Sequence, residues 1–191
     1  MRCIKIITLL IICVSCNIEN NTPGKIKVYY PIDSVLMAQQ KLLKEVNPQL
    51  KKTARVDQNQ DTVTLRLDSA GWAQEMQIFS DITINKPALR DSYLTDTVKT
   101  DTGRWIKYSA KEKQKENVEI EFLHLFFDSK DLLREVELFY KETSSLYNAK
   151  REMQLQFSDN QRISGYRVNG YQKIVLKDTI QYQINATIEY D

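Results

Sequence analysis

The chain has 191 residues, of which 42% are hydrophobic and 27% are charged, a composition typical of a globular protein with a substantial core. Its 27 lysines and arginines against 25 aspartates and glutamates give a formal net charge of +2, and Arg2 and Lys5 account for that excess. The remaining sequence is neutral, so its charge gives no reason to propose nucleic-acid binding.

The first sixteen residues have the pattern of an export signal. Two basic residues precede the apolar run Ile6–Val14, which at about nine residues is too short for a membrane span of about 20. Ser15 supplies a small residue immediately before Cys16. We therefore predict a signal peptide over residues 1–15 and lipid attachment to Cys16. Ordinary secretion with cleavage nearby is the alternative, although no Ala-x-Ala site is present.

The cysteines all lie in this leader or at its end, at Cys3, Cys13 and Cys16. The mature chain would therefore have no disulfide, although it would enter an oxidising compartment. Residues 16–25 are mostly polar, include three asparagines, Pro23 and Gly24, and fit a lipidated tether. Residues 26–191 have the right length for a single domain.

The first half of this domain predicts two main helices. A short strand is expected first, because apolar or aromatic residues alternate with others at Ile26, Val28 and Tyr30. A helix should follow, with Asp33 and Ser34 at its start and its end at about Val46. After a short strand over residues 63–67, Asp68 or Ser69 can cap a second helix. In it, three large apolar residues recur with helical spacing, namely Trp72, Met76 and Phe79. Pro87 can begin one further short helix.

From about Tyr93 onward the pattern is that of antiparallel strands. Candidate strands cover residues 104–110, 118–128, 132–142 and 151–158. Asn169-Gly170 predicts a two-residue hairpin turn, because both positions tolerate positive φ, and Lys177-Asp178 predicts a second. Apolar and polar residues alternate from Ile180 to Tyr190, so one side of this sheet should be buried and the other wet.

Early helices followed by a meandering sheet predict an α+β fold, with the N-terminal helices packed on a curved, mainly antiparallel sheet. Such a sheet could curl into an open half-barrel. That shape would resemble the carrier and acceptor proteins of bacterial lipoprotein transport in architecture alone, since no motif is shared with them.

Residues with catalytic or metal-binding chemistry are sparse. His124 is the only histidine, and its apolar neighbours favour a structural role over a catalytic one. Oxygen-bearing residues occupy positions 1, 3, 5 and 12 of a calcium loop at Asp57, Asn59, Asp61 and Asp68. Thr62 stands where that loop needs glycine, which favours a solvated turn. We predict no catalytic residues, no resident metal and no cofactor.

The segments Trp72–Phe79, Asp81–Leu89, Leu146–Asn148 and Gly170–Lys173 resemble uncharacterised lipoproteins of Bacteroidota envelopes. The resemblance implies a location without an activity. Many surface-exported lipoproteins of that group carry a cluster of acidic residues just after the lipidated cysteine. Here Glu19 is the only acidic residue within residues 17–21. We therefore expect an outer-membrane anchor that faces the periplasm. The expected function is that of a non-enzymatic binding or accessory protein, with a membrane contact through Cys16 and an envelope protein or an apolar ligand as partner. A lipid or lipoprotein carrier-like cup is the alternative, and an envelope hydrolase is the third possibility.

Overall fold

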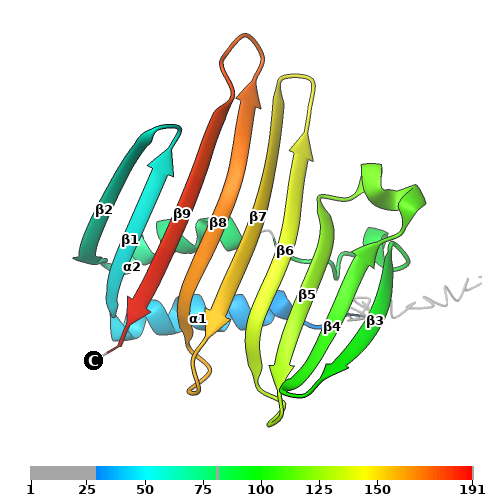
Figure 1. Ribbon diagram of the computed structural model, residues 1–191, viewed down its shortest axis with the longest axis horizontal. Helices are drawn as coiled ribbons and strands as arrows, with labels where there is room; N and C mark the ends of the chain where they lie inside the picture. The colour runs from blue at the N-terminus through cyan, green and yellow to red at the C-terminus, as the bar shows by residue number, and fades with distance from the viewer. Residues whose placement is uncertain (1–28, 81, 191) are drawn as a thin grey trace, which may run out of the picture.

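The computed structural model describes residues 29–80 and 82–190 (Figure 1). This part of the chain forms one antiparallel sheet in the order β2-β1-β9-β8-β7-β6-β5-β4-β3. The sheet is open, because within the described residues β2 and β3 each pair on one side only. The strands are β1 Gln49–Val56, β2 Asn59–Arg66, β3 Tyr93–Thr100, β4 Gly103–Ala110, β5 Ile120–Asp128, β6 Leu133–Thr143, β7 Tyr147–Phe157, β8 Ile163–Ile174 and β9 Ile180–Glu189.

Two α-helices lie on one side of this sheet, α1 Ile32–Val46 and α2 Ser69–Met76, and both pass behind it in Figure 1. The Asp68 side chain caps α2 by accepting the Gly71 N–H at 2.7 Å, as its residue type predicts. Asn47 ends α1 in the left-handed conformation, with φ 50°. Short 3-10 helices follow at Gln77–Phe79, Pro87–Leu89 and Glu112–Asn117. The α+β class and both main helices are confirmed.

The core fills the space between the helices and the sheet. Trp72 and Phe79 are at most 1% exposed, and they share one apolar cluster with Leu155 and Val168 of the sheet. Each large apolar side chain buried in this way contributes about 1.5–3 kcal/mol. The other sheet residues of this cluster include Leu123, Leu125, Val136, Leu138 and Ile163.

Two polar contacts fasten the helices to the sheet across this core. Lys52 Nζ of β1 donates to both carboxylate oxygens of Glu75 on α2, at 2.8 and 2.9 Å, and the Tyr166 hydroxyl donates to the same carboxylate. The Gln39 amide of α1 is 8% exposed and bonds the loop that precedes β8. Because these groups are largely removed from water, their hydrogen bonds fix where each helix sits.

The predicted hairpin turn at Asn169-Gly170 is wrong, because both residues lie inside β8. Glycine is needed there for a different reason: a Cβ at Gly170 would lie 2.8 Å from the Tyr182 hydroxyl and 2.7 Å from the Lys150 carbonyl oxygen. The Tyr182 ring crosses this position so that its hydroxyl accepts a hydrogen bond from Arg151 Nε at 3.0 Å. The chain does turn between Ile174 and Ile180, near the second predicted turn.

The predicted first strand is also wrong in its described part, because Tyr29 and Tyr30 belong to no strand. Ile26 and Val28 lie outside the described residues. The strand expected at residues 63–67 is the second half of β2, and its partner β1 was not expected.

Candidate functional site

The two faces of the sheet are covered differently (Figure 1). We call the side that packs against α1 and α2 the helix face and the opposite side the open face. Within residues 29–80 and 82–190, no helix crosses the open face. The helix face is filled by packed side chains, and the hollow between α1 and the α2 segment measures only about 120 Å³. The open face is therefore the larger accessible surface for a ligand or partner.

A continuous line of polar side chains crosses the open face at right angles to the strands. Each strand contributes one residue, and the strand pairing places each directly opposite the next. We call this line the polar row; from β3 to β2 it consists of Asp96, Lys107, His124, Glu137, Gln154, Arg167, Asn185, Thr53 and Thr62.

Hydrogen bonds between neighbouring strands hold several of these side chains in place. Arg167 Nε donates to Asn185 Oδ1 at 2.9 Å, and the Thr53 and Thr62 hydroxyls lie 2.9 Å apart. The Gln154 amide donates to the Glu135 carboxylate on β6. Side chains that are already oriented lose less conformational entropy when a ligand binds.

Aromatic side chains flank the row on both sides where it crosses β4–β6. On one side Trp105 packs against Phe126, with ring centroids 5.1 Å apart. On the other side Phe122 stacks on Phe139 at 6.1 Å. We call these two pairs the aromatic walls. The second apolar side of β5 faces this uncovered surface.

The titratable groups at the centre of the row have shifted pKa values. Burial and the nearby Lys107 ammonium lower the pKa of His124. His124 is therefore neutral at neutral pH, and its 3.9 Å contact with Glu137 is not an ion pair there. Burial and the adjacent Glu135 carboxylate raise the pKa of Glu137. Both shifts follow from placing polar groups between aromatic side chains.

Two hollows lie along the row, and a third lies beside it, toward the β1–β2 turn. One of about 290 Å³ is lined by Phe122, Glu137, Gln154 and Arg167, among others. A second, of about 270 Å³, shares Gln154 and Arg167 with the first. A third, of about 330 Å³, shares Asn169 with the first. Because these hollows share lining residues, they form one shallow track from β5 to β1.

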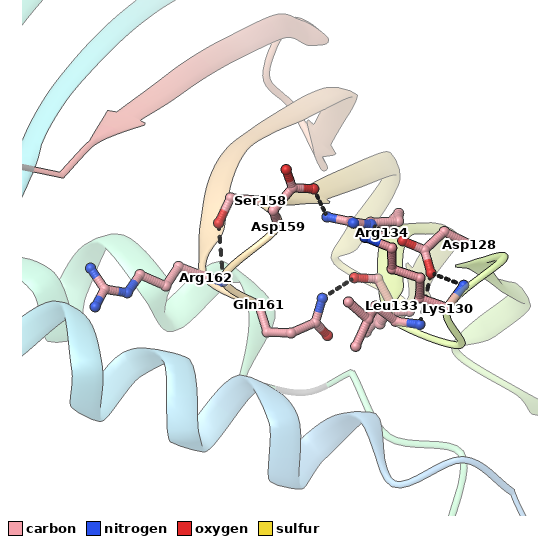
Figure 2. A network of polar contacts seen from close by, with 9 residues as sticks. Asp128, Lys130, Leu133, Arg134, Ser158, Asp159, Gln161 and Arg162 are labelled. Carbon is pink, nitrogen blue, oxygen red and sulfur yellow. Dashed lines mark hydrogen bonds and ion pairs between the residues drawn. The ribbon is translucent and has the colours of Figure 1, made fainter.

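Polar contacts connect the loops at one end of the central strands (Figure 2). Arg134 donates to Asp128 of the β5–β6 connection and to Asp159 of the β7–β8 loop, at 2.6 Å in each case. Gln161 Nε2 donates to the Leu133 carbonyl oxygen at 3.1 Å. The Leu132 N–H and then the Arg134 guanidinium lower the pKa of Asp128. The two hairpins are thereby joined below the row.

The candidate site residues predicted from the sequence do not come together in one site. His124 lies in the polar row. Asp57 lies in the β1–β2 turn and Asn59 and Asp61 lie at the start of β2, whereas Asp68 caps α2 beyond the far end of β2. Strand β2 keeps these carboxylates apart, since its eight residues extend about 26 Å. No group of three or more metal-ligating side chains is found in residues 29–80 and 82–190. Cys16 lies outside the described residues.

The sequence did not single out Gln154, Arg167 and Asn185. The alternation from Ile180 to Tyr190 predicted a solvent-facing side chain at Asn185, but only the observed register brings the three residues into one line.

Comparison with known proteins gives no relative, because no family model, curated protein or solved structure matches this chain. In the part of the chain that the structure describes, no helix combines the length and the apolar character needed to cross a membrane.

Proposed function

We propose that this protein is a lipoprotein of the bacterial envelope that binds a ligand or partner without catalysing a reaction. In this proposal the lipid on Cys16 anchors the chain to the outer membrane, facing the periplasm. The observation that carries the binding part is the open face, where hydrogen-bonded polar side chains and aromatic walls line a shallow track. The leader sequence carries the anchoring part.

The chemistry of the track supports binding over hydrolysis. His124 contacts Glu137 and stacks on Phe122 at 4.6 Å, and among the described residues no serine, threonine or cysteine forms a hydrogen bond with it. A nucleophile and base must lie within hydrogen-bond reach of each other.

The carrier-like cup, the alternative, has less support. An apolar ligand on the helix face would have to displace Trp72 and Phe79, which are buried in the core. The apolar side chains left exposed at that face include Val56 and Ile180, at 44% each, and Val63, at 39%, and they lie on β1, β9 and β2 at one edge of the sheet. Organic extraction of the native protein tests this alternative, which predicts a co-purifying lipid.

Fractionation of native envelopes tests the anchor. We expect wild-type protein in the membrane fraction and the Cys16→Ala variant in the soluble fraction. Cys13→Ala is the matched control, because it removes a neighbouring leader cysteine but leaves the predicted lipid site, and it should fractionate like wild type. Equal membrane retention of Cys16→Ala would overturn the lipid anchor.

A further inference from the structure

The polar row has a chemistry that selects among ligands. Its charged members alternate in sign across the sheet, from Asp96 to Lys107 to Glu137 to Arg167. The charges cancel along the row, so it offers no net field to a polyanion or a polycation. The remaining members carry amides, hydroxyls and a neutral imidazole, which both donate and accept hydrogen bonds.

The arrangement of apolar groups is the reverse of that in a protein-docking patch. Protein interfaces have an apolar centre and a polar rim. Here the polar row runs through the middle, and the apolar rings stand on either side of it, Trp105 with Phe126 and Phe122 with Phe139. A ligand that matches this pattern has hydrogen-bonding groups along its length and C–H surfaces that can pack against rings.

The spacing of the row also constrains the ligand. Neighbouring strands lie about 4.8 Å apart, so a row across nine strands is roughly 40 Å long. A strand spacing is close to the length of one pyranose residue in an extended polysaccharide. Each sugar could therefore meet the side chain of one strand, and its hydroxyls could pair with the planar amide or guanidinium groups.

We propose that the open face binds an extended, neutral polysaccharide whose chain runs along the polar row, across the strands. The aromatic walls pack against the C–H faces of sugars over β4–β6, and Gln154, Arg167 and Asn185 bond sugar hydroxyls over β7–β9. This inference rests on the proposed binding function and names its ligand class.

Native gel electrophoresis of the detergent-solubilised full chain tests this proposal. The gels contain mixed-linkage β-glucan, mannan, xylan or dextran as neutral probes, or polygalacturonate as an anionic one. We expect at least one neutral probe to retard the wild type. Trp105→Ala and Arg167→Ala should each weaken the apparent affinity about tenfold, the effect of losing roughly 1.4 kcal/mol of binding free energy.

Two further variants make the result specific to the row. Arg167→Lys keeps the positive charge but loses the guanidinium fork, so it should also weaken retardation. This variant still tests the proposal if Arg167→Ala fails to fold. Arg90→Ala removes an exposed arginine from the segment that follows α2, away from the row, and should behave like wild type.

Three outcomes would overturn the proposal. They are unchanged wild-type mobility with all four neutral probes, retardation by polygalacturonate alone, and retardation by a neutral probe that the row variants do not weaken. None of these would alter the Cys16 fractionation result, so the ligand assignment can fail while the anchored binding function stands.

Discussion

The contact between Gln39 and the β7–β8 loop gives a sharp prediction about folding. Gln39 Nε2 donates to the Gln161 carbonyl oxygen at 2.8 Å, and its Oε1 accepts the Ile163 N–H at 2.9 Å. The Gln39→Met substitution keeps a long, unbranched side chain with good helix propensity but removes both bonds. The change in stability that it causes should therefore reflect the loss of the two hydrogen bonds and not a change in packing.

The expected loss of stability depends on how deeply each of the two hydrogen-bond partners of Gln39 is buried. Ile163 is 0% exposed, so its N–H would be left unpaired inside the protein at a cost of about 1–3 kcal/mol. Gln161 is half-buried, and its carbonyl could be hydrated instead, at a smaller cost. We expect the free energy of unfolding to fall by about 2–3 kcal/mol, which lowers the melting temperature by roughly 4–12 °C for a domain of this size.

Urea denaturation followed by tryptophan fluorescence measures this change, since Trp72 is fully buried in the native state. Gln40→Met is the matched control: it makes the same chemical change at the next residue, whose side chain forms no hydrogen bond with the described residues. It should unfold within about 0.5 kcal/mol of wild type. A Gln39→Met variant as stable as this control would refute the claim that the amide fastens α1 to the sheet.

Three other substitutions test the packing and the charges. Gly170→Ala should destabilise the fold by about 1–3 kcal/mol in the same urea assay, because the new methyl group meets the Tyr182 ring and a backbone oxygen. Glu75→Ala should cost about 2 kcal/mol, because it leaves Lys52 without its carboxylate partner beneath α2. Asp128→Asn should be destabilising at about pH 7 but progressively less so below about pH 4, because the pKa of Asp128 is lowered on folding and its contribution is lost as the folded carboxylate becomes protonated.

Two of these predictions have a control variant, and the third has a result that would contradict it. Asn169→Ala changes the residue beside Gly170 on the opposite face and should cost less. Glu45→Ala removes a carboxylate that is 61% exposed and should be nearly neutral. For Asp128→Asn, a stability difference from wild type that stays constant between about pH 7 and pH 3 would show that the carboxylate charge is not involved.

The helices could be predicted from sequence because their signals are local. Trp72 and Met76 recur with helical spacing, and Asp68 marks the start of α2; the structure confirms both features, whereas Phe79 lies in the short 3-10 helix that follows α2. Strand β1 could not be predicted, because Lys52 occupies one of its inward positions. That lysine is neutralised by Glu75 on α2, a contact 23 residues away.

The error at Gly170 has a similar origin. Asn-Gly is a strong turn signal, but here glycine makes room for a tyrosine from the neighbouring strand. The polar row was also beyond prediction, because it depends on the register of nine strands. Irregular pairing within β5–β6 and β7–β8 shifts that register, and alternation within a single strand does not reveal it.

The central claim is that ligands bind the open face of the sheet. Site-specific photocrosslinking in native envelopes tests it most directly, with a benzoylphenylalanine probe placed either at Asn185 in the polar row or at Lys41 on α1. We predict polysaccharide-positive crosslinked products from the Asn185 probe and none from the Lys41 probe. Crosslinked products from Lys41 alone would contradict the account, because they would place the binding surface on the helix side.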